Sequence, residues 1–141
     1  MQETSLPVEH LFTMTATVGR ATSIKAGPMG TRLLVPVLSG TFEGPKLRGK
    51  IADAPAGDWV YSRPDGSIKL DVRLTLLTDD GAAILMMYSG IGIRDEAAMS
   101  LRIAPQFETG DDRYSWLNNV QAVGIGTFAG GATTNKVYAL R

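Results

Sequence analysis

Apolar and polar side chains alternate along most of the chain. In residues 12–18, four apolar side chains at even positions alternate with three threonines. The longest regular stretch is residues 68–76, where five aliphatic side chains at even positions alternate with Lys69, Asp71, Arg73 and Thr75. A period of two is typical of a β-strand that buries one face. The pattern therefore predicts a chain that is mostly extended.

Glycine-containing turns separate the predicted strands. Asp-Gly pairs at 65–66 and 80–81 flank the strand at 68–76, and such pairs tolerate the positive φ angles of tight hairpin turns. Two glycines at 130–131 predict a third turn. Strands are predicted at residues 12–18, 32–42, 47–52, 58–63, 68–76, 82–93, 99–107, 119–128 and 136–141. Pro36 has no N–H to donate, so it favours an edge position or a bulge in the second of these strands.

A single antiparallel β-barrel accounts best for these elements. Segments 95–100 and 111–118 are predicted as one helical turn and as a short helix or loop, respectively, and the chain has no good amphipathic helix. About eight strands with short connections fit a barrel or a sandwich. We favour a closed or nearly closed barrel, because closure removes exposed strand edges. Residues 1–141 contain no polar linker and are predicted to form one all-β domain.

The composition excludes several classes of function. The 141 residues carry 14 Lys and Arg against 14 Asp and Glu, and this zero net charge argues against a nucleic-acid partner and against a polybasic membrane-surface protein. The chain has no cysteine and one histidine, so thiolate and multi-histidine metal sites are excluded and no cofactor is expected. Its first residues lack a basic stretch followed by an apolar core. We therefore expect no signal peptide and a cytoplasmic location.

Short motifs follow one another along the chain in a recognisable order. They include Glu-His-Leu-Phe at 9–12, Gly-Thr-Phe-Glu-Gly-Pro at 40–45, Asp-Trp at 58–59, Leu-Asp-Val-Arg at 70–73, Pro-Gln-Phe-Glu-Thr-Gly at 105–110 and Tyr-Ser-Trp-Leu-Asn at 114–118. The order resembles the bacterial and fungal domain-of-unknown-function family 3237, over nearly the whole chain. This resemblance implies a barrel related to allene oxide cyclases and dirigent proteins.

Asp71, Arg73 and Glu108 are the candidate catalytic residues. Asp71 and Arg73 lie two positions apart on a strand, so their side chains share a face. A carboxylate beside a guanidinium can hold a polar substrate or stabilise an oxyanion, and the alternative is a surface or interstrand ion pair. Glu108 follows a predicted strand. It either faces the barrel mouth as an acid or base, or accepts hydrogen bonds from the turn after it.

Aromatic side chains supply candidate walls for a small-molecule pocket. Tyr114, Trp116 and Trp59 combine a large apolar ring with a polar tip, and Asn118 can bind a carbonyl or hydroxyl group. The alternative for the aromatic residues is a core plug that closes one end of the barrel. His10 is the only histidine. It either pairs with a distant carboxylate as a general base or is a structural residue.

These candidates predict a cofactor-independent isomerase, cyclase or lyase that binds a small apolar or aromatic molecule with a carbonyl or hydroxyl group. Asp71 or Glu108 would move a proton, and Arg73 with Asn118 would hold a developing oxyanion. The alternatives are a carrier barrel without turnover and a structural module. If Asp71 and Arg73 face inward, the aliphatic face of residues 68–76 points outward, and we then expect a homo-oligomer through that face.

Overall fold

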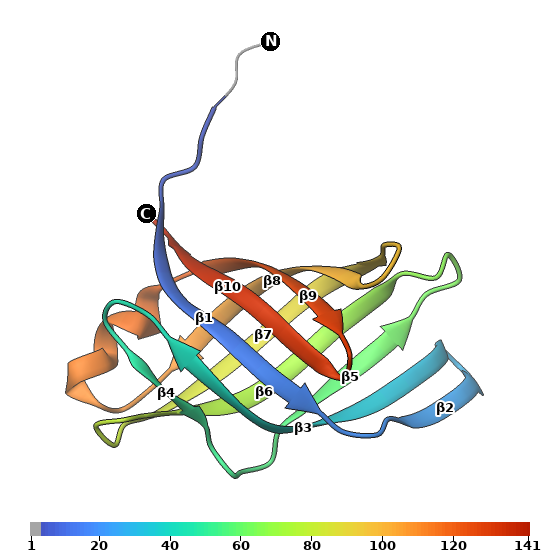
Figure 1. Cartoon of the computed structure of the whole chain (residues 1–141), viewed down its shortest axis with the longest axis horizontal. Coiled ribbons are helices and arrows are strands. Elements are labelled where there is room, and N and C mark those ends of the chain that lie inside the picture. The colour runs from blue at the N-terminus through green and yellow to red at the C-terminus, as the bar shows by residue number, and fades with distance from the viewer. Residues whose placement is uncertain (1–3) are drawn as a thin grey trace.

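The computed structural model describes residues 4–141 and folds them into an antiparallel β-barrel (Figure 1). The strands are β1 (Val8–Val18), β2 (Thr22–Gly27), β3 (Gly30–Glu43), β4 (Arg48–Ile51), β5 (Gly57–Ser62), β6 (Ile68–Thr78), β7 (Ala83–Arg94), β8 (Met99–Glu108), β9 (Ala122–Ala129) and β10 (Ala132–Leu140). The barrel closes because β1 pairs with β10 on one side and with β3 on the other. Strands make up 66% of the described residues and helix 6%, and the closed antiparallel barrel has eight strands, which confirms the predicted barrel of about eight strands.

The long strand β3 joins two parts of the barrel. It pairs with β1 and β4 near its end and with β5 and β2 near its start, and β4 and β5 both pair with β6. A register shift leaves Leu38 unpaired with β1, two residues from Pro36, as expected for a strand that contains a proline. β2 was not predicted. All its residues except Gly27 are exposed, so it lacks the alternation that marks the other strands.

The aliphatic face of β6 forms part of the core. Leu70, Val72, Leu74 and Leu76 are buried inside the barrel, whereas Asp71 and Arg73 are exposed on its outer surface. The inward placement of Asp71 and Arg73 is therefore wrong. It follows that the aliphatic face of β6 is not available as an interface between copies of the chain. The physical reason is that burying these four aliphatic side chains is far more favourable than burying two charges.

The two ends of the barrel differ. The short 3₁₀ helix η1 (Asp112–Asn119) lies across one end, where Leu117 is fully buried (Figure 1). Segment 95–98, between β7 and β8, is a hydrogen-bonded turn rather than the predicted helical turn, and it lies at the opposite end. No helix within residues 4–141 is long and apolar enough to span a membrane. The start of the segment in which we expect no signal peptide, residues 1–3, lies outside the described residues.

Candidate functional site

A cavity of about 320 Å³ opens at the end of the barrel away from η1. It is lined by Leu33, Val35, Asp58, Val60, Ile68, Arg94, Ala97, Ala98, Met99 and Phe128. Eight of these ten side chains are apolar, so the cavity suits an apolar molecule. The two charged residues differ in placement, because Arg94 is exposed at the rim whereas Asp58 is partly buried. Asp58 is therefore the group in this cavity whose chemistry the barrel can alter most.

The position of Asp58 follows from an interruption in the barrel wall. β5 pairs with β6 at Asp58 and again at Tyr61, but Trp59 and Val60 between them have no partner on β6. The Asp58 carboxylate lies at this interruption and accepts a hydrogen bond from the backbone N–H of Asp71, with 3.0 Å between nitrogen and Oδ1. One carboxylate oxygen thus replaces a missing ladder acceptor. The side chain is held by this bond while it lines the cavity.

Burial shifts the protonation equilibrium of this carboxyl group. It raises the pKa of Asp58 from 3.8 to about 6, because the low-dielectric surroundings disfavour the charged form. The hydrogen bond from the Asp71 N–H opposes this shift, and the negative charge of the Asp71 side chain adds to it. A carboxyl group with a pKa near 6 can both accept and return a proton close to neutral pH.

Tyr88 accompanies Asp58 inside the barrel. Asp58 is aligned with Val72 on β6, and Val72 is aligned with Tyr88 on β7, so the two polar residues flank one buried valine. Burial raises the pKa of the Tyr88 phenol well above its usual range, and the nearby charge of Asp58 raises it further. Tyr88 is therefore a neutral hydroxyl group at every physiological pH. It can donate a hydrogen bond but cannot act as a base.

Comparison with known proteins identifies the family. A family model described as "Protein of unknown function (DUF3237)" matches residues 6–140. The chain belongs to the DUF3237 family. It is 33% identical to a UPF0311 protein of Rhodopseudomonas palustris strain TIE-1, over 89% of each chain. It is 30% identical to the hydroalkoxylation enzyme phnH of Penicillium herquei, over 83% of this chain and 72% of that protein.

Solved structures agree with the barrel described above. A crystal structure of a beta-barrel like protein from Acinetobacter baumannii AYE superimposes with a TM-score of 0.87 at 28% identity. The superposition covers 99% of the DUF3237 chain and 100% of the other.

The DUF3237 barrel does not bring Asp71, Arg73 and Glu108 together on one pocket. Asp71 and Arg73 line an open depression on the outer surface, beside Ser89 and Gln106. They form no ion pair with each other in residues 4–141. Glu108 is exposed at the η1 end of β8, the far end from the cavity that Asp58 lines. The predicted convergence of these three residues is therefore wrong.

Asn118 has a structural partner at the η1 end. Its side-chain oxygen accepts from the backbone N–H of Thr109 at 2.8 Å, and its side-chain nitrogen donates to the Thr109 carbonyl at 3.0 Å. These two bonds fasten the end of η1 to the end of β8. Asn118 and Glu108 line a separate surface depression that has no residue in common with the Asp58 cavity.

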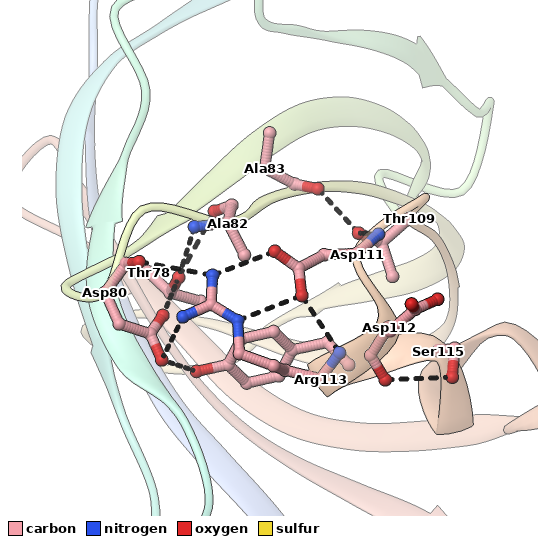
Figure 2. A network of polar contacts seen from close by, with 10 residues as sticks. Thr78, Asp80, Ala82, Ala83, Thr109, Asp111, Asp112, Arg113 and Ser115 are labelled. Atoms are coloured by element: carbon pink, nitrogen blue, oxygen red, sulfur yellow. Dashed lines mark hydrogen bonds and ion pairs between the residues drawn. The ribbon is translucent and has the colours of Figure 1, made fainter.

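Tyr114 belongs to a polar network that fastens η1 to the turn between β6 and β7. Its hydroxyl donates to Asp80 at 2.8 Å, and Asp80 also accepts from the Thr78 hydroxyl at 2.6 Å (Figure 2). Arg113 bridges Asp80 and Asp111. Hydrogen bonds and the charge of Arg113 lower the pKa of Asp111 to about 2. The arrangement matches the alternative in which these residues close one end of the barrel.

The other three predicted pocket residues also lie apart from the cavity. Trp116 packs against the core from η1, and the Lys46 ammonium lies 5.3 Å from its ring centre. His10 contacts the Thr13 hydroxyl at 3.1 Å, and its ring lies 5.4 Å from that of Tyr138. Trp59 points outward with 44% of its surface exposed.

Sequence reasoning missed Asp58 although it lies next to Trp59 in a motif that carries the family resemblance. Neighbouring residues on a strand face opposite sides, so the prediction that Trp59 faces the pocket excluded Asp58. Asp58 precedes Val60 by two positions, and Val60 is buried. That spacing was the signal in the sequence that Asp58 faces the core.

Proposed function

We propose that this DUF3237 barrel binds a small, largely apolar molecule and catalyses a proton transfer within it without a cofactor. The observation that carries the proposal is the Asp58 carboxyl group, with a pKa of about 6, in an otherwise apolar cavity. Isomerases, cyclases and lyases of this kind need a group that removes a proton from one atom of the substrate and returns it to another. Asp58 takes the role that the sequence suggested for Asp71 or Glu108.

The proposed reaction balances within one substrate molecule. At neutral pH most Asp58 is ionised, so it removes a proton from a hydroxyl group or from a carbon next to a carbonyl. The electron pair left behind forms the new bond or shifts the double bond. The Asp58 acid then returns the proton to a carbon of the same molecule. Burial and the charge of Asp58 both raise the pKa of the Tyr88 phenol, so Tyr88 stays a neutral hydroxyl group near the reacting carboxyl group.

The hydroalkoxylation enzyme of Penicillium herquei supports this class of reaction. Hydroalkoxylation adds the O–H of an alcohol across a carbon–carbon double bond, so a proton leaves oxygen and a proton arrives at carbon. The same carboxyl chemistry serves both steps. A cyclising addition of a hydroxyl group to an alkene is therefore the reaction we propose to test first.

Deuterium incorporation tests the proposal directly. An ortho-hydroxychalcone, whose hydroxyl group can add across its own enone, is incubated in D₂O with the wild type and with Asp58→Asn, Glu108→Gln and Arg73→Ala. We expect the wild type to form a cyclised isomer one mass unit heavier, Asp58→Asn to lose at least 100-fold in rate, and the two controls to remain within about twofold. Equal rates for the wild type and Asp58→Asn would exclude Asp58 as the proton-transfer group.

A carrier barrel is the second candidate function. It is favoured by the hydrogen bond that Asp58 accepts from the Asp71 N–H, because this bond gives the carboxylate a structural role without turnover. One titration with the chalcone distinguishes the two functions, if binding and conversion are both followed. A carrier binds the chalcone and leaves it unchanged, whereas an enzyme converts it. In either case we propose a cytoplasmic protein without nucleic-acid or membrane partners.

We also propose a homo-oligomer, but through the outer face of β7 to β10. That face carries an open groove of about 770 Å³, and its lining includes the apolar side chains of Ile91, Val123, Ile125 and Tyr138. Contiguous apolar surface of this kind is typical of interfaces, and such a patch is complementary to the same patch on a second copy. Light scattering should give a mass above the 15.1 kDa of one chain, and Ile125→Asp should reduce it to 15.1 kDa. A 15.1 kDa wild type would exclude this interface.

A further inference from the structure

Asn135 carries a buried amide that has no hydrogen-bond partner among residues 4–141. The residue lies on β10, and none of its surface is exposed. Both polar atoms of its side chain, Nδ2 and Oδ1, are buried, and neither makes a hydrogen bond within residues 4–141. Most buried polar side chains in proteins are hydrogen-bonded, because an unpaired amide loses its bonds to water on folding and gains nothing in return. An unpaired amide in the core therefore indicates a missing partner.

The amide is accommodated by a glycine on the neighbouring strand. Gly126 on β9 is the register partner of Asn135, and a Cβ atom at Gly126 would overlap Asn135 Oδ1. The side chain of Asn135 therefore lies across the backbone of Gly126, on the inner side of the barrel wall. Any larger residue at position 126 would displace it.

The register places this amide next to the cavity. Gly126 is aligned with Leu101 on β8, and two positions further toward the open end Phe128 is aligned with Met99. Phe128 and Met99 both line the Asp58 cavity. Asn135 thus lies deeper in the barrel than Phe128, by one pair of residues along β9. Phe128 is 37% exposed and Met99 has a flexible side chain, so a bound molecule can displace them.

Asn135 and Asp58 approach the barrel interior from different sides. Around the barrel, β10 pairs with β1, β1 with β3, and β3 with β5, so two strands separate β10 from β5 in that direction. In the other direction four strands separate them. Asn135 is not among the residues that line the cavity, so a bound molecule reaches the amide only when Phe128 and Met99 move aside. Such a molecule would then have the carboxyl group on one side and the amide on the other.

We propose that the Asn135 amide binds the hydroxyl or carbonyl group of the small molecule that occupies the barrel, and thereby orients it toward Asp58. This inference rests on the proposed function of the cavity. An amide both donates and accepts, so it selects a ligand that carries a hydroxyl or carbonyl group over an apolar ligand of the same shape.

A pair of matched probes tests this selection. Naphthol and methylnaphthalene have nearly the same size, and only naphthol has a hydroxyl group. We expect the wild type to bind naphthol at least tenfold more tightly than methylnaphthalene, measured by fluorescence titration. Asn135→Leu should bind the two probes equally and keep the wild-type affinity for methylnaphthalene. It should also melt at a higher temperature without ligand, because the unpaired amide is gone.

A measurement on the wild type alone guards against a variant that fails to fold. The side-chain amide resonances of Asn135 should shift on addition of naphthol and change less with methylnaphthalene in ¹⁵N NMR spectra. Equal wild-type affinities for the two probes would overturn the role of Asn135 and leave the cavity as a binding site. Failure of both probes to bind would overturn the role of Asn135 and the proposed binding function together.

Discussion

The backbone N–H of Asp71 donates to the Asp58 carboxylate at 3.0 Å, although the two side chains lie on opposite sides of the barrel wall. Asp58 lines the cavity and Asp71 faces outward on β6. The bond spans the point where β5 and β6 do not pair. Asp58 is thus both a hydrogen-bond acceptor in the barrel wall and the candidate catalytic group. Asp71 acts on it from the outer surface through the backbone N–H and the side-chain charge.

Asp58→Asn should make the stability of the protein less dependent on pH. The pKa of Asp58 is 3.8 in the unfolded chain and about 6 in the folded protein, so the folded state must ionise a buried group as the pH rises through this interval. The wild type therefore loses roughly 2 to 3 kcal/mol of unfolding free energy between pH 4 and pH 7, because the unfolded chain is already partly ionised at pH 4. Asparagine can still accept the Asp71 N–H and carries no charge.

Urea unfolding of the two proteins at both pH values measures this difference. Asp58→Asn should be about 2 to 3 kcal/mol more stable than the wild type at pH 7, relative to their difference at pH 4. A difference that does not change with pH would show that the Asp58 carboxyl group is not destabilised by burial.

Asp71→Asn should lower the pKa of Asp58. The charge of Asp71 raises that pKa, and asparagine keeps the backbone N–H that donates to Asp58 while it removes the charge. Carboxyl ¹³C NMR titration measures the shift. Arg73→Ala is the matched control on the same exposed face of β6, and both variants should change stability by less than about 0.5 kcal/mol. An unchanged Asp58 titration in Asp71→Asn would contradict the electrostatic link.

Tyr114→Phe should lower the free energy of unfolding without affecting ligand binding. The variant removes the hydroxyl that donates to Asp80 and retains the ring (Figure 2). Loss of one such bond costs about 0.5 to 1.5 kcal/mol, measured by urea unfolding. Because Tyr114 lies at the η1 end, chalcone affinity should stay within twofold of the wild type. A large loss of affinity would instead show that Tyr114 contributes to the ligand pocket, as the sequence predicted.

Gly126→Ala should destabilise the barrel by about 1 to 3 kcal/mol, because the new Cβ atom would overlap Asn135 Oδ1 and crowd the backbone oxygen of Thr134. Gly110→Ala is the matched control, since a Cβ atom there meets nothing within 4 Å. Thermal melting curves compare the two. Equal melting temperatures would mean that the Asn135 side chain does not lie across Gly126.

The pattern along the chain determined the architecture. Alternation in 68–76 and in 12–18 predicted β6 and β1, and the Asp-Gly pairs predicted turns in which Gly66 and Gly81 have positive φ angles. These features are local, because the apolar face of a strand and a turn that needs positive φ both depend only on residues close together in the sequence. β2 was missed because it lies outside the core and carries no alternation.

Only the tertiary structure decided which polar residues form the site. Sequence spacing shows that Asp71 and Arg73 share a face but not which face is inside, and here burial of the aliphatic residues of β6 placed both outside. Burial raises the pKa of Asp58, and the cavity that it lines is built by β3, β5, β6, β7, β8, β9 and the turn after β7. The Asn135 amide is buried without a hydrogen-bond partner among residues 4–141, because closure of the barrel encloses it. Such properties depend on contacts between strands far apart in the chain, so no local pattern specifies them.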